Sequence, residues 1–162
     1  MVTIKKPLIY ASTISLILAS FVPATQAREL MRDVKVTHLD NSAAIPTTAR
    51  FQGATHKFEV HVRGETLAEL AIDLPEGISI RKGIEVTNQS GEKVDAKVSV
   101  TDRKATVVFS QPVSSETTLL VSMRGVNTLD YSRTLMYRIY GKMVGAIAAI
   151  PLGTARIQTY GR

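Results

Sequence analysis

The chain has 162 residues, of which 44% are hydrophobic and 21% are charged, and its net charge is +6. It contains no cysteine, which excludes disulfides as a source of stability and a thiolate as a catalytic nucleophile. The length that follows an N-terminal leader fits one domain with one hydrophobic core.

The N-terminus has the three regions of a secretory signal peptide. Lys5 and Lys6 precede an apolar run over residues 8–22, and a small-residue cleavage site ends at Ala27. The run is 15 residues long, shorter than the roughly 20 residues that a transmembrane helix requires. We therefore predict a signal peptide over 1–27 that is cleaved after Ala27. The mature chain is expected to be secreted or periplasmic and to lack a transmembrane helix.

Residues 28–55 carry few apolar side chains at regular spacing. Residues 41–42 and Pro46 are breaks that interrupt any longer element in this segment. The sequence predicts an irregular N-terminal arm over 28–55, which lies over a β-sandwich domain spanning 56–162.

Period-two alternation dominates the rest of the chain. Phe58, Val60 and Val62 alternate with polar residues, and such alternation places apolar side chains on one face of a half-buried strand. No stretch with a 3.6-residue period is long enough to serve as a crossover helix. The pattern therefore predicts an all-β fold, an Ig-like antiparallel β-sandwich. Strands are predicted over 57–63, 69–74, 84–86, 93–101, 105–109, 119–123, 135–140 and 155–160.

Residues 143–150 form an apolar stretch of small side chains that ends at Pro151. It is too short to span a membrane. We predict a buried strand, or a loop that packs on a sheet edge.

Positive charge is concentrated near the C-terminus. Residues 124–162 contain six basic residues and one acidic residue, Asp130. A basic region on an exported protein favours anionic partners, namely an envelope glycan, lipid head groups or another envelope protein. Nucleic acid is not expected, because the net charge is modest and the predicted location is extracytoplasmic.

Two C-terminal strands carry the candidate binding residues. Guanidinium groups form bidentate hydrogen bonds with phosphate or carboxylate, and aromatic rings beside them can stack on sugars. The alternation predicts that these side chains form neighbouring outward rows. The candidate residues are Arg138, Tyr140, Arg156 and Tyr160.

Metal ligands are few in this sequence. His56 and His61 fall on opposite faces of one predicted strand, so a regular strand does not offer both to one ion. Basic neighbours of His61 further disfavour a divalent ion there. The sequence predicts no metal site and no cofactor. The alternative is a periplasmic copper carrier, because thioether and imidazole groups suit copper; its ligands would come from Met31, Met123, Met136, Met143, His38 and His56.

Enzyme signatures are missing from the sequence. The serines lack a Gly-x-Ser-x-Gly context, and no pair of carboxylates has a spacing that indicates a shared cleft. We therefore predict a non-enzymatic binding or structural module.

Four segments carry a resemblance to a known family: the turn at 74–77, Val-Val-Phe-Ser-Gln-Pro-Val at 107–113, the strand at 117–123, and the closing segment 151–160, which includes Leu-Gly-Thr-Ala-Arg-Ile-Gln. Together they resemble a family of small exported proteins, mostly cyanobacterial, that is classified only as a domain of unknown function. The resemblance extends from about residue 57 to the end of the chain. It implies a signal peptide, a β-rich domain and a place in the envelope, and it supplies no catalytic residue and no ligand.

Overall fold

The computed structural model describes residues 35–101, 103–129 and 131–161, and these contain ten β-strands and no helix. The predicted signal peptide lies outside the described residues. None of the described segments could cross a membrane as a helix. The strands are β1 (His38–Ile45), β2 (Ala54–His61), β3 (Leu67–Asp73), β4 (Ser79–Ile80), β5 (Ile84–Asn88), β6 (Ala96–Val100), β7 (Lys104–Val113), β8 (Thr118–Asn127), β9 (Arg133–Met143) and β10 (Ile150–Thr159).

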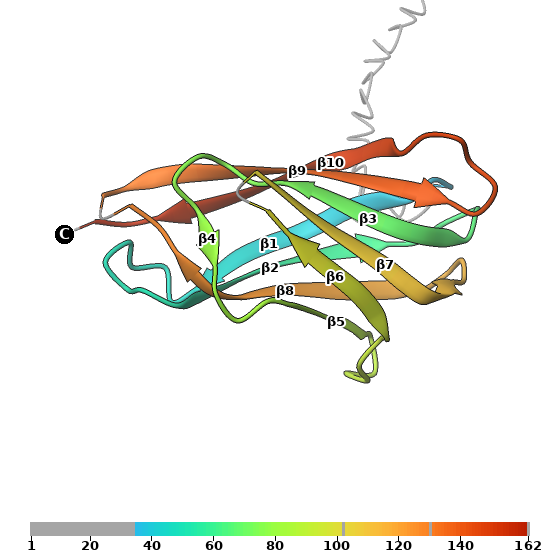
Figure 1. Cartoon of the computed structure of the whole chain (residues 1–162), viewed down its shortest axis with the longest axis horizontal. Coiled ribbons are helices and arrows are strands. Elements are labelled where there is room, and N and C mark those ends of the chain that lie inside the picture. Colours follow the sequence, from blue (N-terminus) through green and yellow to red (C-terminus); the bar gives the residue numbers. More distant parts are fainter. Residues whose placement is uncertain (1–34, 102, 130, 162) are drawn as a thin grey trace, which may run out of the picture. The chain divides into compact units, whose positions relative to one another are not determined.

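The strands form two antiparallel sheets (Figure 1). The first sheet has the order β1-β2-β8-β4, and β5 also pairs with β8. The second sheet has the order β10-β9-β3-β7-β6. This arrangement confirms the predicted all-β antiparallel sandwich.

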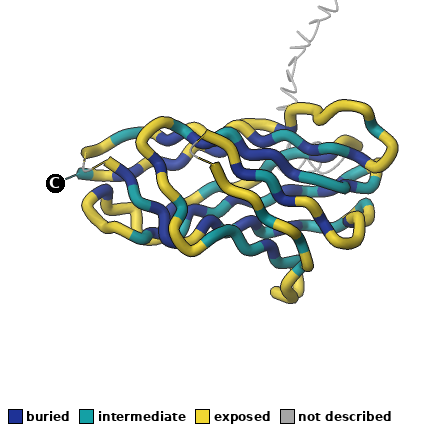
Figure 2. Tube along the Cα trace, in the orientation of Figure 1, coloured by how far each residue is buried: buried dark blue, intermediate teal, exposed yellow. Residues whose placement is uncertain are grey.

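The core lies between the two sheets. Buried and more exposed residues alternate along most strands (Figure 2), as the two-residue period of a strand requires. Phe58 on β2, Leu119 on β8, and Leu70 and Ile139 in the second sheet are fully buried. Burying a side chain of this size contributes about 1.5–3 kcal/mol relative to leaving it exposed. Packing of this kind stabilises a sandwich that has no disulfide.

The prediction of an irregular arm over 28–55 is wrong for β1. This strand pairs with β2 in a register that runs from His38 opposite His61 to Ile45 opposite Thr55. Of its eight residues only Ala44 is buried, because β1 is an edge strand of its sheet. An edge strand with so few core side chains does not show the apolar alternation that marks the central strands.

Within the stretch 143–150, residues 144–149 connect β9 to β10 as a loop, and the two end residues belong to the strands. Gly145 adopts a positive φ of 78°, the left-handed conformation that glycine adopts without strain in tight turns. Ile147 is 99% exposed, and Val144 and Ile150 are also exposed. Of the two alternatives expected for this stretch, the buried strand is wrong and the loop is the one observed, with Ala146 packed against the core.

The two sheets approach each other along one edge, where β1 lies beside β10. The Ser42 hydroxyl donates a hydrogen bond to the Arg156 carbonyl (2.9 Å), and Thr48 forms an isolated parallel bridge with Tyr160. β1 and β10 are edge strands of their sheets, so their contact places these two edges against each other.

Candidate functional site

Three of the four candidate binding residues lie near one another on the outer face of the second sheet. Leu135, Tyr137 and Ile139 of β9 point into the core, so Arg138 between them points outward. Arg138 lies opposite Thr154 of β10, and Arg156 lies opposite Met136. Arg138 and Arg156 are therefore diagonal neighbours on adjacent strands, and the Cα atoms of such a pair are about 7–8 Å apart. Tyr140 follows Arg138 on the same face of β9 and is half-buried.

Tyr160 is not brought to this group. Tyr140 lies opposite Pro151 at the start of β10, whereas Tyr160 follows the other end of that strand. Tyr160 lies nine residues beyond Pro151 along an extended chain, so about 30 Å separates these two residues. Tyr160 is exposed and pairs with the segment that follows β1.

A groove of about 640 Å³ lies on the outer face of the second sheet, and Arg138 contributes to its wall. We call this depression the basic groove. Its lining residues are Asp73, Leu74, Pro75, Arg103, Lys104, Met136, Arg138 and Thr154.

Three cations meet in the basic groove because β3 lies between β7 and β9. Asp73 at the end of β3 lies opposite Lys104 on β7 and opposite Arg138 on β9. Arg103 precedes Lys104, and the pair follows the turn after β6. Arg103 and Lys104 are not among the residues predicted from the sequence, because only the strand order places them beside Arg138. The signal in the sequence that could have indicated them is a pair of adjacent basic residues directly before the alternating residues 105–109.

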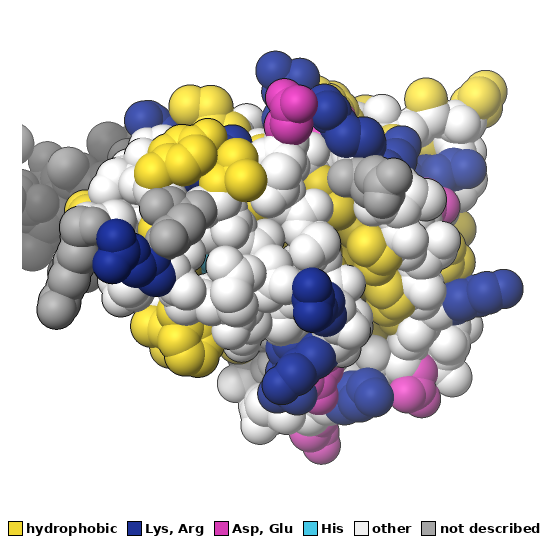
Figure 3. Space-filling model, turned by 60° about the vertical axis from the view of Figure 1, so that its left-hand side comes forward, with side chains coloured by type: hydrophobic (Ala, Val, Ile, Leu, Met, Phe, Trp, Pro, Cys, Tyr) yellow, Lys and Arg dark blue, Asp and Glu magenta, His cyan; other side chains and the backbone are white. Residues whose placement is uncertain are grey.

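Charge and shape in the basic groove suit an anionic ligand. Among the described residues that line the groove, Arg103, Lys104 and Arg138 are accompanied by one carboxylate, that of Asp73. None of these three cations forms an ion pair within the part of the chain that the structure describes. On the face that Figure 3 shows, Lys and Arg side chains stand in separate groups, and Asp and Glu side chains lie beside some of them. Guanidinium groups that have no carboxylate partner can fork onto the oxygens of a bound anion.

A polar pair lies inside the core and joins the two sheets. His56 of β2 and Tyr137 of β9 are both fully buried, and His56 Nδ1 is 2.6 Å from the Tyr137 hydroxyl. Their rings meet edge to face. Burial lowers the pKa of His56 to about 4 and raises the pKa of Tyr137, an effect that the nearby Arg133 reduces. Both groups are therefore neutral at pH 7, and their hydrogen bond fixes how the sheets face each other.

Replacing the Tyr137 hydroxyl tests this hydrogen bond. In Tyr137→Phe the ring remains while His56 loses its partner, and a buried polar group without a partner costs about 1–3 kcal/mol. We expect the free energy of unfolding in urea to fall by that amount. The matched control is Tyr140→Phe on the same strand, where the half-buried ring should leave stability within about 0.5 kcal/mol. Equal stability of the two variants would contradict a structural role for the pair.

No family model matches this chain, and no curated protein matches it. Solved structures do resemble it. The RrgA Jo.In complex is 12% identical over 64% of this chain and 70% of that chain, with a TM-score of 0.44. The collagen-binding domain of a Staphylococcus aureus adhesin is 7% identical over 77% of this chain and 97% of that chain, with a TM-score of 0.44. A DUF4466 family protein from Parabacteroides merdae is 13% identical over 76% of this chain, with a TM-score of 0.48. This chain spans 45% of that protein.

The residues of the copper alternative are dispersed in the fold. Met123 and Met143 are buried in the core, and Met123 lies opposite His56. Met136 is exposed on the outer face of the second sheet, while His38 is on β1 of the first sheet. Met31 lies outside the described residues. Within the described segments, the fold does not gather these methionines and histidines into one site.

Proposed function

We propose that this chain is an exported, non-enzymatic binding module of the cell envelope that holds an anionic glycan in the basic groove. The observation that carries the proposal is the convergence of Arg103, Lys104 and Arg138 around one depression of about 640 Å³. Export rests on the predicted signal peptide over 1–27. The proposal also assigns the chain to the small exported, mostly cyanobacterial family that its sequence resembles.

The chemistry of the basic groove suits phosphate-bearing or carboxylate-bearing sugars. The guanidinium groups of its arginines can bind an oxyanion through two hydrogen bonds, and the ammonium group of its lysine provides a compact positive charge. Met136 and Pro75 add apolar surface against which the C–H face of a sugar ring can pack. Arg156 lies beside Met136 across the β9–β10 pair, so it extends the positive surface along the sheet. An open groove of this kind suits a segment of polymer better than a small buried ligand.

Charge reversal in this surface provides the test. Replacing Arg138 and Arg156 together by Glu should lower retention of the protein on isolated cell-wall material at low salt by at least about tenfold. A hydrogen bond to a charged group is worth about 1.5–3 kcal/mol, and 1.4 kcal/mol corresponds to a factor of ten. Added salt should also release the wild-type protein, because ions screen exposed charges.

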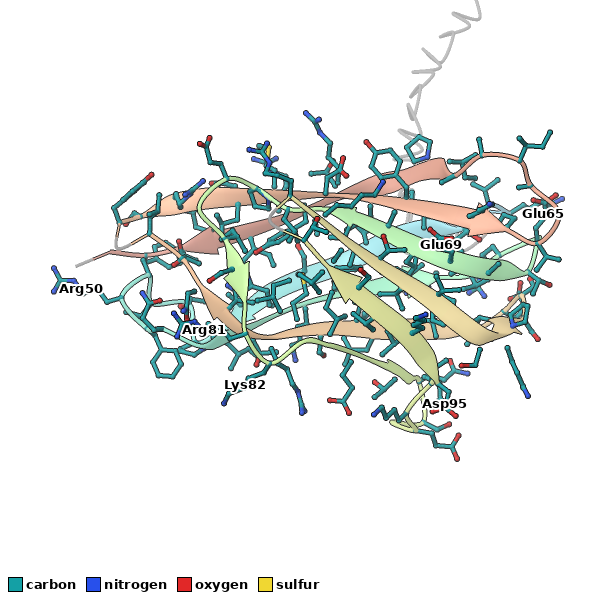
Figure 4. All side chains as sticks on the ribbon, viewed as in Figure 1. Arg50, Glu65, Glu69, Arg81, Lys82 and Asp95 are labelled. Atoms are coloured by element: carbon teal, nitrogen blue, oxygen red, sulfur yellow. The ribbon has the colours of Figure 1, made fainter. Side chains whose placement is uncertain are left out.

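Two controls separate this site from a general charge effect. Arg81→Glu with Lys82→Glu makes the same change of net charge at exposed positions between β4 and β5 (Figure 4). This control variant should be retained like the wild type. Asp73→Asn removes the one carboxylate of the basic groove and should strengthen retention. Equal losses in both charge-reversed variants, or unchanged retention in Arg138→Glu with Arg156→Glu, would contradict the proposal.

A further inference from the structure

Four metal-ligating side chains meet on the first sheet, away from the basic groove. β1 contains His-x-Asp, with His38 and Asp40, and β2 contains Glu-x-His, with Glu59 and His61. The β1–β2 register sets His38 opposite His61 and Asp40 opposite Glu59. Because residues two apart share a face of a strand, all four side chains belong to one face. We call them the histidine–carboxylate cluster.

The spacing within the histidine–carboxylate cluster fits a shared cation. His61 Nε2 lies 3.8 Å from Asp40 Oδ2 and 3.9 Å from Glu59 Oε2. Both separations are too long for hydrogen bonds. Two atoms bound to one ion at about 2.0–2.2 Å lie about 3.4 Å apart in a tetrahedral site and at most about 4.3 Å apart, so binding would draw the two carboxylates a few tenths of an ångström closer to His61. The ligand atoms of these three residues all lie within 4.8 Å of one another.

His61 has an unused ring nitrogen at the centre of this group. Its Nε2 atom is buried and has no hydrogen-bond partner among the described residues. A buried polar atom without a partner is costly and calls for an explanation, such as an ion that completes its environment. Here the carboxylates of Asp40 and Glu59 lie 3.8 Å and 3.9 Å from Nε2 and attract a cation to the same point.

A β-bulge at Asn41 holds both carboxylates in position. The register of β1 shifts between Asp40 and Ser42, and Asn41 has a positive φ of 32°. The Asn41 backbone N–H donates to Asp40 Oδ1 at 2.8 Å, and its side-chain amide donates to Glu59 Oε2 at 3.1 Å. Hydrogen bonds of this kind orient the ligands in metal sites. Asp40 Oδ2 therefore stays directed toward His61.

His38 lies beside His61, but its ring nitrogens are outside the group of ligand atoms that lie within 4.8 Å of one another, so its side chain would have to turn to add a fourth ligand. Its ring centroid lies 5.2 Å from that of His61, and its Nδ1 is 3.0 Å from the Val36 carbonyl oxygen. A carbonyl accepts, so the Nδ1 proton points to Val36 and Nε2 is free to bind a metal. Metal-ligating histidines almost always donate their second ring nitrogen in this way.

Basic neighbours do not neutralise the histidine–carboxylate cluster. These neighbours were predicted to disfavour a divalent ion at His61, but Arg63 Nη1 forms an ion pair with Glu116 at 2.8 Å. Lys57 lies two residues before Glu59, and its cross-strand neighbours are Ala43 and Ser122, which do not belong to the cluster. A depression of about 380 Å³ is lined by Glu59, His61 and the loop after β5, and it gives an ion access from solvent.

We propose that Asp40, Glu59 and His61, with His38 as the fourth ligand, bind one divalent transition-metal ion of the Zn²⁺ class. Imidazole nitrogen with carboxylate oxygen suits Zn²⁺ and its neighbours, whereas Mg²⁺ and Ca²⁺ require oxygen ligands. Two carboxylates balance the charge of the ion. This site is separate from the basic groove, so a negative result for metal binding would leave the glycan-binding proposal standing, and the reverse also holds.

Calorimetric titration with Zn²⁺ tests the site. The full-length protein is purified without a polyhistidine tag and stripped with a chelator. We expect one Zn²⁺ per chain and no binding of Mg²⁺. His61→Gln, and separately Asp40→Asn, should weaken Zn²⁺ binding by at least about tenfold, since even partners that only orient ligands contribute 10–100-fold. His38→Gln should cause a smaller loss. Because Asp40 is exposed, Asp40→Asn keeps the test valid if His61→Gln does not fold.

A matched control removes two carboxylates elsewhere. Glu69→Gln with Asp95→Asn changes one residue of the second-sheet strand β3 and the residue before β6 (Figure 4), and this variant should bind Zn²⁺ like the wild type. In nuclear magnetic resonance spectra, Zn²⁺ should shift the ring nitrogen signals of His61, while those of buried His56 stay unchanged. No Zn²⁺ binding by the wild type, or equal binding by His61→Gln and the wild type, would overturn the proposal.

Discussion

Between pH 7 and pH 4 the free energy of unfolding should fall by about 3 kcal/mol through His56 alone. Burial in the core lowers the pKa of His56 to about 4, while the unfolded chain has the ordinary value of about 6.5. The unfolded state therefore binds a proton in this window and the folded state does not. The stability that neutral His56 supplies is complete above pH 6.5 and is lost as the pH falls toward 4.

Urea unfolding at a series of pH values measures this effect. A chelator is added so that no metal ion contributes to stability. In His56→Gln, which has no imidazole in the core, the fall between pH 7 and pH 4 should shrink by about 3 kcal/mol relative to the wild type. The same slope in both proteins would show that His56 is not held neutral by burial.

Phe58→Ala should lower the free energy of unfolding by about 3–5 kcal/mol. Phe58 is 1% exposed and lies on the central part of β2, opposite Ser42 of β1 and Val121 of β8. Truncation removes most of a large apolar side chain and leaves a cavity that neighbouring strands fill only in part. Urea denaturation, followed by circular dichroism, gives the difference directly.

The matched control for this truncation is Val108→Ala on β7. Val108 is 43% exposed, so its truncation opens no cavity and should change stability by about 0.5 kcal/mol or less. Comparable losses in Phe58→Ala and Val108→Ala would contradict the placement of the core between the two sheets.

The sandwich was predictable because most of its strands bury one face and expose the other. β2, β7, β8 and β9 each contribute alternating apolar side chains to the core, and this alternation is visible in the sequence. β1 was not predictable in this way. It contributes one buried residue, and its pairing depends on the backbone of β2 rather than on an apolar pattern.

The candidate sites depend on strand order more than on local pattern. Arg138 and Arg156 could be selected because consecutive strands in a charged region were expected to pair. Arg103 and Lys104 meet Arg138 only because β3 lies between β7 and β9, an arrangement that joins segments far apart in the chain. The pairing of His-x-Asp with Glu-x-His likewise needed β1, so the metal-ligating cluster followed from the structure.

The most direct test of the binding proposal maps where an anionic glycan touches the protein. The wild-type protein is titrated at low salt with a phosphate-bearing oligosaccharide while its backbone amide signals are recorded. We expect the largest shifts around 103–104, 136–138 and 154–156, which belong to the basic groove and the strand beside it. An absence of shifts, or shifts confined to the first sheet, would contradict the account.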